Sequence, residues 1–404
     1  MPESSFDPVR ELSPANRHQI YAELRDQAPI YWSSAYSAWI LTRYADVSAI
    51  LRHPDALALD GISFLESFSQ RGNLDLSSLI RFWSSVSLFT RGPHHDAVRR
   101  MLAHALGGIR RMNLPELLER RADLLLDGGE RDGSIDLVAG YGKALALFVI
   151  GSFLGVPEED LPELSRLAAD LIIMFERTVP SVNTLIKLNK SAAASLEYFE
   201  RLIDWRRRER RDDGISLMVE LADKQLRCSD QELAGYCTFF FIAAEESTAA
   251  AISESALILL RRPELRAHLA GDPSRVPLAA RELLRLVSPV QYVGRQMRVD
   301  FRVADRSIRA GQPIILMLGA ANRDPADFPN PDEPRLDRSG PETLVFAAGP
   351  YRCIGAQLAT FEVETAVRKL LQRPRIQLSP QVPAWTDRTN IAPLIRLQAD
   401  FRNL

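Results

Sequence analysis

The feature that most constrains the fold is a long stretch, from Ser229 to Leu260, in which nothing interrupts a helical pattern. Ser229-Asp-Gln-Glu232 has the spacing of a capping box, and the next proline is Pro263. At 1.5 Å per residue, about thirty residues form a helix roughly 45 Å long, which is enough to cross a whole domain. This length predicts an α-rich fold with the helix at its centre.

Helical periodicity also dominates the rest of the chain, and strand signals are few and short. Apolar residues at three- and four-residue spacing predict helices at 17–28, 46–52, 97–105, 115–126, 137–154, 158–177 and 191–211. A β-hairpin is expected at 29–42, with further strands at 299–303, 313–318 and 394–397. The chain is therefore predicted to be mainly α with small β-sheets, as a single domain over residues 1–404.

Composition excludes several classes of protein. Lys and Arg number 50 and Asp and Glu number 52, and this balance argues against a nucleic-acid-binding protein. The N-terminus has no basic segment followed by an apolar one, and the apolar run 234–251 carries two glutamates, so we expect no signal peptide and no membrane anchor. We expect a cytoplasmic monomer. The three cysteines, Cys228, Cys237 and Cys353, are too few for a disulfide framework and lack zinc-site spacing.

The sharpest local pattern surrounds one of these cysteines, in Phe346-Ala-Ala-Gly349-Pro-Tyr-Arg-Cys353-Ile-Gly355. Cys353 precedes an expected helix at 354–371, whose N-terminal amides would stabilise a thiolate. Gly349 permits a tight turn, and Gly355 allows a flat group to approach the backbone closely. These are the requirements of an axial haem ligand, although a lone cysteine is more often a buried, inert one.

The spacing Phe-x-x-Gly-x-x-x-Cys-x-Gly resembles the cysteine loop of the cytochrome P450 superfamily. The resemblance implies the P450 fold, with a long central helix, and haem b bound through the thiolate of Cys353, with Phe346, Gly349 and Gly355 beside it. It also implies O2 as co-substrate, and electrons that come from NAD(P)H through a ferredoxin and a ferredoxin reductase.

Two further motifs follow the order of that family. Glu282-Leu-Leu-Arg285 is similar to its Glu-x-x-Arg pair, since residues three apart share a helix face and can form a buried ion pair. Arg323 and Arg335 are then the expected additional partners of Glu282. Alone, such spacing is usually that of a surface pair.

In the long helix, Ala243-Ala-Glu-Glu246-Ser247-Thr248 resembles the family's oxygen-activation motif. By this resemblance Ala243 lies beside the haem, Glu246 delivers protons, Ser247 holds the dioxygen, and Thr248 completes the catalytic group. Because Glu245 and Glu246 are about 100° apart on a helix, they cannot share one role. The alternative is that a glutamate here points into a solvated cleft.

A third match, His95-Asp-Ala-Val-Arg99, is similar to the helix that binds haem propionates, since residues four apart lie on one face. Arg295 and Tyr351 occupy two more positions at which the family binds propionates, although Tyr351 replaces the usual His or Arg. The chain also departs from the family at Ala244 and Ala347, which replace glycines, and at Ser247, which replaces threonine.

The resemblance predicts a monooxygenase that hydroxylates or epoxidises a small or medium organic substrate, free or carrier-bound, in specialised metabolism. The alternatives are an atypical oxidation, such as phenol coupling or desaturation, and a non-catalytic haem protein. Residues expected to face the substrate are Phe64, Phe82, Trp83, Ile242, Val290, Gln291, Tyr292 and Val293.

Overall fold

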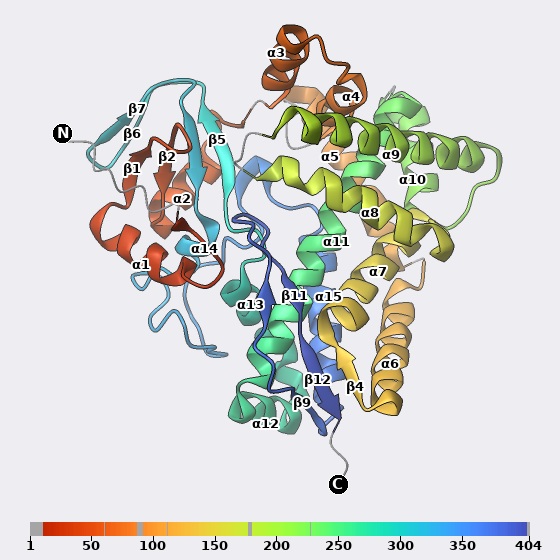
Figure 1. Ribbon diagram of the computed structural model, residues 1–404, viewed down its shortest axis with the longest axis vertical. Coiled ribbons are helices and arrows are strands. Elements are labelled where there is room, and N and C mark those ends of the chain that lie inside the picture. The colour runs from red at the N-terminus through yellow and green to blue at the C-terminus, as the bar shows by residue number, and fades with distance from the viewer. Residues whose placement is uncertain are drawn as a thin grey trace. The chain divides into compact units, whose positions relative to one another are not determined.

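The computed structural model describes residues 11–59, 61–86, 92–110, 112–176, 180–226 and 228–401. The chain packs into two compact units: one comprises Met1–Leu59, Leu125–Gly142 and Ser247–Leu404, and the other Asp60–Leu124 and Lys143–Glu246. Helices predominate and the sheets are small, which confirms the predicted class (Figure 1). That residues 1–404 behave as a single domain stays a prediction.

In the second of these units, the described residues form helices joined by short connections, with no strand among them. Its helices are α3 (Ile62–Gly72), α4 (Ser77–Ser85), α5 (Gly92–Gly107), most of α6 (Leu114–Asp132), α7 (Ala144–Leu154), α8 (Leu161–Leu171), α9 (Val182–Arg208) and α10 (Gly214–Leu221). Helix α9 begins nine residues before the predicted start at Ser191, because Ser181 caps it by accepting a hydrogen bond from the Thr184 N–H at 3.1 Å.

The long helix is present as α11, Asp230–Leu260. Its capping box is formed in both directions: the Glu232 N–H donates to Ser229 Oγ at 3.2 Å, and the Ser229 N–H donates to Glu232 Oε2 at 2.9 Å. The helix ends at the residue before Arg261, ahead of Pro263, as predicted. This helix contributes residues to both units.

The first unit contains the described β-structure. A five-stranded sheet has the order β1-β2-β8-β5-β3, from β1 (Ile30–Ser33), β2 (Ala38–Leu41), β3 (Ala56–Ala58), β5 (Val293–Met297) and β8 (Pro313–Leu316). Strands β1 and β2 form the predicted hairpin, in which Ile30 pairs with Leu41 and Ser33 with Ala38. Smaller sheets join β6 (Phe301–Val303) to β7 (Arg306–Ile308), β10 (Ala384–Trp385) to β11 (Leu394–Arg396), and β4 (Ser134–Asp136) to β12 (Gln398–Phe401) and β9 (Ile376–Leu378).

The five-stranded sheet is covered on both faces, which explains why its central strand is continuously apolar. Ile314 and Leu316 lie in one cluster with α2 (Tyr44–Arg52), whereas Ile315 lies in another with α1 (Arg17–Gln27). The unit also contains α12 (Pro263–Gly271), α13 (Val276–Val287), α14 (Leu318–Ala321) and α15 (Ala356–Leu371), and α13 packs against α15.

The predicted helix 137–154 is interrupted. Residues Leu137–Lys143 form π-helical turns before α7 begins. Here Gly142 packs so closely on α11 that an added Cβ would lie 2.8 Å from the Ala249 carbonyl oxygen, and the Ser253 hydroxyl donates to the Leu137 carbonyl at 3.2 Å. Leu137–Leu154 is the one described helical stretch that is long and apolar enough to cross a membrane, and 56% of it is buried inside the protein.

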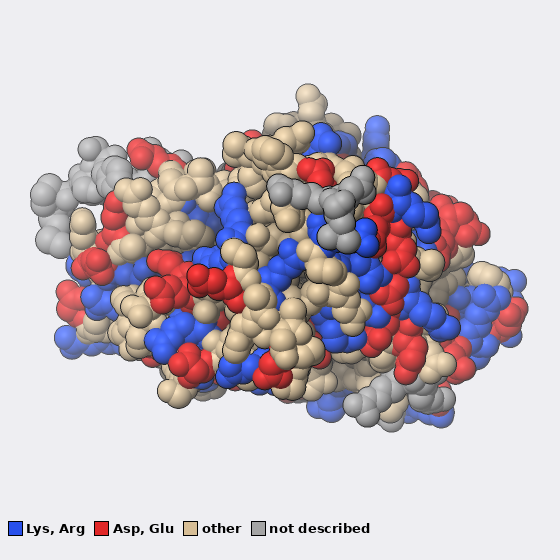
Figure 2. Space-filling model, turned by 90° about the horizontal axis from the view of Figure 1, so that it is seen from below, with Lys and Arg blue, Asp and Glu red and all other residues tan. Residues whose placement is uncertain are grey.

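Charged side chains of both signs are interleaved on the face shown in Figure 2. This pattern agrees with the formal net charge of −2. On this face, no surface of a single sign of the kind that a polyanion requires is seen among the described residues.

Candidate active site

The cysteine loop is held by backbone contacts at residues with unusual conformations. The Cys353 N–H donates to the Phe346 carbonyl at 2.8 Å, and the Ala347 N–H donates to the Leu344 carbonyl at 2.9 Å. Gly349 has a φ of 70°, and an added Cβ there would lie 2.2 Å from the Leu51 carbonyl oxygen. Only glycine therefore fits at Gly349 without displacing the loop. Helix α15 begins at Ala356, two residues after the predicted start.

The three thiols lie in different environments. Cys353 is exposed, whereas Cys228 and Cys237 are buried. Burial raises the pKa of the Cys228 thiol to about 12, and burial also raises the pKa of the Cys237 thiol. Since a thiolate is the form that ligates a metal, Cys353 is the candidate ligand. No group of three or more His, Cys, Asp or Glu side chains that could hold a bare metal ion occurs among the described residues.

A buried arginine lies next to this loop. The Arg295 guanidinium is 5.0 Å from the centre of the Tyr351 ring, and Arg295 is only 4% exposed. Its Nη1 donates to the Gly294 carbonyl at 2.8 Å, but its buried Nε has no hydrogen-bond partner. Burial lowers the pKa of Arg295 to about 10. A buried cation with an unused donor is a site for an anionic group.

The middle of α11 is open on one side. Ala243 is exposed, and Glu246 and Ser247 are half-buried, whereas Ile242, Glu245 and Thr248 are buried. Ala243 therefore presents its small side chain at the accessible side of this turn, next to buried Ile242 and half-buried Ala244. The acid and the alcohol of the motif thus lie at an accessible position.

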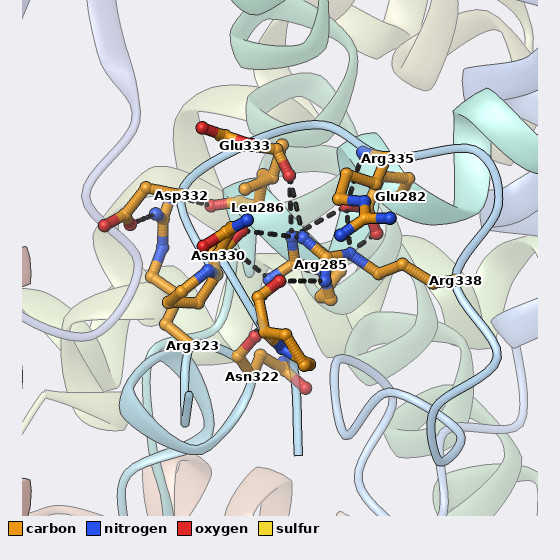
Figure 3. A network of polar contacts seen from close by, with 12 residues as sticks. Glu282, Arg285, Leu286, Asn322, Arg323, Asn330, Asp332, Glu333, Arg335 and Arg338 are labelled. Carbon is orange, nitrogen blue, oxygen red and sulfur yellow. Dashed lines mark hydrogen bonds and ion pairs between the residues drawn. The ribbon is translucent and has the colours of Figure 1, made fainter. Parts of the chain in front are cut away.

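The pair Glu282–Arg285 lies at the centre of a buried network (Figure 3). Arg285 Nε and Nη2 donate to the two Glu282 oxygens at 2.8 and 2.7 Å, in a bidentate pair. Arg285 Nη1 also donates to the Asn322 carbonyl at 2.8 Å. Although burial opposes ionisation of Glu282, hydrogen bonds from Arg285 and Arg338 lower its pKa. The carboxylate is therefore held charged inside the protein.

Asn322 connects this network to the cysteine loop. Its Oδ1 accepts a hydrogen bond from the Leu344 N–H at 2.6 Å, and its Nδ2 donates to Ser288 Oγ at 2.9 Å. The Leu344 carbonyl in turn accepts a hydrogen bond from the Ala347 N–H. The ion pair thus supports the start of the loop that carries Cys353.

Comparison with known proteins agrees with this geometry. The family model described as "Cytochrome P450" matches residues 161–395. The chain is 32% identical over 367 residues to the biotin biosynthesis cytochrome P450 of Bacillus subtilis (strain 168), covering 90% of this chain and 91% of the relative. It is 33% identical over 383 residues to the mycinamicin IV hydroxylase/epoxidase of Micromonospora griseorubida, covering 92% and 91%. The chain belongs to the cytochrome P450 family.

Solved structures of P450s show the same fold. The crystal structure of P450BioI in complex with acyl carrier protein ligated to hexadec-9Z-enoic acid matches with a TM-score of 0.88 and 30% identity, over 96% of this chain and 99% of that one. CalO2 matches with a TM-score of 0.88 and 27% identity, over 99% of each chain. As a P450, the protein is a haem-dependent monooxygenase that uses O2 and electrons derived from NAD(P)H through redox partners.

The residues present fit the haem of a P450. Within one unit, Cys353 offers an exposed thiol, and Arg295 offers an unused buried donor for a carboxylate. The Tyr351 ring packs against Arg295, so this replacement for the usual His or Arg orients the arginine. Arg352, beside the cysteine, pairs with Glu342 at 2.6 Å.

His95 and Arg99 lie on α5 as predicted. His95 is 5% exposed, and its Nδ1 lies 3.1 Å from Asp96 Oδ1. Burial lowers the pKa of His95, although Asp96 opposes the shift. The imidazole is therefore a neutral hydrogen-bonding group at neutral pH. The propionate-binding role of both residues stays a prediction.

Two expected contacts of the ion-pair network need correction. Arg323 pairs with Asp332 and donates to the Leu286 carbonyl at 2.8 Å, so its side chain does not bind Glu282. The Arg335 side chain pairs with Asp337, and only its backbone N–H reaches Glu282 Oε1, at 3.0 Å. The second cation is Arg338, whose Nε donates to Glu282 Oε1 at 2.7 Å. Arg338 lies three residues after Arg335, and the conformation of this loop turns the Arg338 side chain toward Glu282 and that of Arg335 toward Asp337.

Residues predicted to face the substrate have different surroundings. Phe82 and Trp83 are buried, and the Trp83 ring packs against the ring of Phe175, with 5.1 Å between the ring centres. Phe64 is 39% exposed on α3.

The four predicted substrate-facing residues at 290–293 also differ from one another in their surroundings. Val290 and Val293 are half-buried. The Gln291 amide, in contrast, donates to the Ser288 carbonyl at 2.6 Å and accepts from the Tyr21 hydroxyl at 3.1 Å, so its polar atoms are used inside the protein. The Tyr292 hydroxyl lies 3.1 Å from Thr389 Oγ1. A direct substrate role for these residues stays a prediction.

Proposed function

We propose that this P450 inserts one oxygen atom from O2 into a C–H or C=C bond of a medium-sized, mainly apolar biosynthetic intermediate. The observation that carries the proposal is the acid–alcohol pair Glu246 and Ser247, half-buried beside exposed Ala243 in the middle of α11. A non-catalytic haem protein has no need of this pair. The biosynthetic names of the relatives favour the same reading.

Cys353 would hold the haem iron through its thiolate, because it is the exposed one of the three cysteines. Arg295 would bind a propionate through its unused Nε, with Tyr351 holding the guanidinium in place. His95 and Arg99 would hold a propionate from α5. Haem b with a thiolate ligand supplies the oxygen activation when it is bound.

Glu246 and Ser247 have distinct tasks in this proposal. The Glu246 carboxyl takes up protons from solvent and passes them on, and the Ser247 hydroxyl directs them to the reacting oxygen. Ser247 lacks the β-branch of the usual threonine, so its hydroxyl is less restricted in rotation. We therefore expect some NAD(P)H consumption without product.

We extend the proposal to a substrate delivered as a thioester on an acyl carrier protein. This rests on the fold shared with P450BioI, which was crystallised with acyl carrier protein ligated to hexadec-9Z-enoic acid. The near-neutral composition also fits an apolar substrate better than a polyanionic one.

The first experiment tests the ligand. The reduced, carbon monoxide-bound protein is expected to show the red-shifted Soret band of thiolate-ligated haem. Cys353→Ala should abolish the band, whereas Cys228→Ala and Cys237→Ala should keep it. Absence of the band in the unaltered protein would overturn the proposed function.

The second experiment tests the substrate class. Hexadec-9Z-enoic acid is offered free and as its acyl carrier thioester, and products are measured by mass spectrometry. A gain of 16 mass units from the thioester alone supports carrier delivery, and the same gain from the free acid alone contradicts it. Products that lose two hydrogens, or that dimerise, would support the atypical oxidation instead.

A further inference from the structure

The structure separates the two adjacent glutamates in the middle of α11. Glu246 is half-buried, whereas Glu245 is 5% exposed. Glu245 Oε1 accepts a hydrogen bond from the Ser165 hydroxyl of α8 at 2.5 Å and lies 3.4 Å from Lys143 Nζ. A carboxylate buried in an apolar helix is costly unless it is paired in this way.

The two partners have different characters. Lys143, at the end of the π-helical segment, has a side chain that is 43% exposed, while Ser165 is 5% exposed. On its other side, α8 is anchored to α9, since Asp170 accepts a hydrogen bond from Ser191 at 2.7 Å and pairs with Lys187 at 2.6 Å. Ser165 therefore belongs to a helix whose position is fixed by its contacts with α9.

We propose that Glu245, held by Ser165 and Lys143, is a positioning residue that fixes the rotation of the α11 turn carrying Glu246 and Ser247. Because these residues follow Glu245 directly, a contact that fixes one side chain of the turn fixes the directions of the next two. The proposal rests on the proposed function, since it assumes that Glu246 and Ser247 serve proton delivery.

We expect the contact between Glu245 and Lys143 to depend on pH. The charged groups that act on Glu245 are Lys143 and, on its own helix, Glu246, and from α8 the neutral Ser165 hydroxyl faces it. The pKa of Glu245 is raised, because the effect of burial exceeds the opposing effects of the Ser165 hydrogen bond and of the Lys143 charge. As the pH falls, Glu245 takes up a proton and Lys143 loses its charged partner. Removing Lys143 or the Ser165 hydroxyl should move this transition to higher pH.

The experiment measures peroxide released per NAD(P)H oxidised by the haem-loaded protein, with a ferredoxin and its reductase and with no added substrate. NAD(P)H, O2 and one proton give NAD(P)+ and hydrogen peroxide, whereas two NAD(P)H, O2 and two protons give two NAD(P)+ and two molecules of water. With no substrate present, the ratio therefore reports how often peroxide is released before the protons needed to form water arrive. In the unaltered protein we expect this ratio to rise as the pH falls. Glu245→Gln should raise the ratio near neutral pH, toward its limit of one peroxide per NAD(P)H, and remove its rise in acid.

Lys143→Met is the second variant, because it alters only a half-exposed partner and keeps Glu245 itself. Its rise in peroxide should begin at a higher pH than in the unaltered protein. Lys187→Met is the matched control, since it breaks another lysine–carboxylate pair on α8 and should leave the curve unchanged. A Lys143→Met curve that coincides with that of the unaltered protein, with the thiolate Soret band intact, would overturn the proposal. Failure of the proposed function would appear instead as absence of that band before any substitution.

Discussion

The conformation of the cysteine loop predicts that replacing Gly349 destabilises the protein. Its φ of 70° lies in the left-handed region, and an added Cβ would meet the Leu51 carbonyl oxygen at 2.2 Å. Gly349→Ala therefore combines backbone strain of about 1–2 kcal/mol with overpacking of about 1–3 kcal/mol. Reduced freedom of the unfolded chain offsets about 0.4–1 kcal/mol of this loss. The expected decrease in the free energy of unfolding is about 2–4 kcal/mol.

Gly311 is the matched control, since it has a φ of 79° but no atom within 4 Å of an added Cβ. Gly311→Ala therefore isolates the backbone strain and should cost about 1 kcal/mol. Urea unfolding of both haem-loaded variants, followed by far-UV circular dichroism, gives the two losses. Equal losses would refute the reasoning, because they would show that the Leu51 contact relaxes without cost. Ala347, with a φ of 54° in the same loop, predicts the opposite sign: Ala347→Gly should be neutral or stabilising by up to about 1 kcal/mol.

Two other substitutions test buried charges by the same unfolding assay. Arg338→Leu removes a partner from buried Glu282 and should cost about 3 kcal/mol, whereas Arg335→Leu, at a 40% exposed side chain, should cost less than about 1 kcal/mol; equal costs would contradict the network. Burial raises the pKa of Glu362 well above its usual value, and its Oε2 has no hydrogen-bond partner. The folded protein thus keeps this proton to a higher pH than the unfolded chain does, so Glu362 contributes stability that is lost as the pH rises. Glu362→Met should therefore gain stability relative to the unaltered protein by up to about 1.4 kcal/mol per pH unit above pH about 4.5, and a gain independent of pH would contradict this.

Local signals predicted the elements that local contacts stabilise. The capping box at Ser229 and Glu232 predicted the start of α11, and alternating strand formers predicted the hairpin of β1 and β2. The interruption of the helix at 137–154 could not be predicted, because it depends on the close approach of Gly142 to α11 more than 100 residues later. In the candidate site, spacing brought Glu282 and Arg285 together, but a loop conformation chose Arg338 as the second cation.

The two glutamates of α11 show most clearly what cannot be predicted from the sequence. From the sequence it follows that neighbouring carboxylates lie about 100° apart on a helix, and therefore that their roles differ. Which of the two glutamates is buried cannot be predicted from the sequence, because the burial of Glu245 depends on contacts with Ser165, 80 residues away, and with Lys143. A hydroxyl and an ammonium beside Glu245 make its burial tolerable, and Glu246 is left at the accessible side of the turn. The motif resemblance alone had proposed Glu246 for proton delivery, and the contacts of Glu245 with Ser165 and Lys143 add a physical reason for that proposal, because they leave Glu246 as the accessible carboxylate of the two.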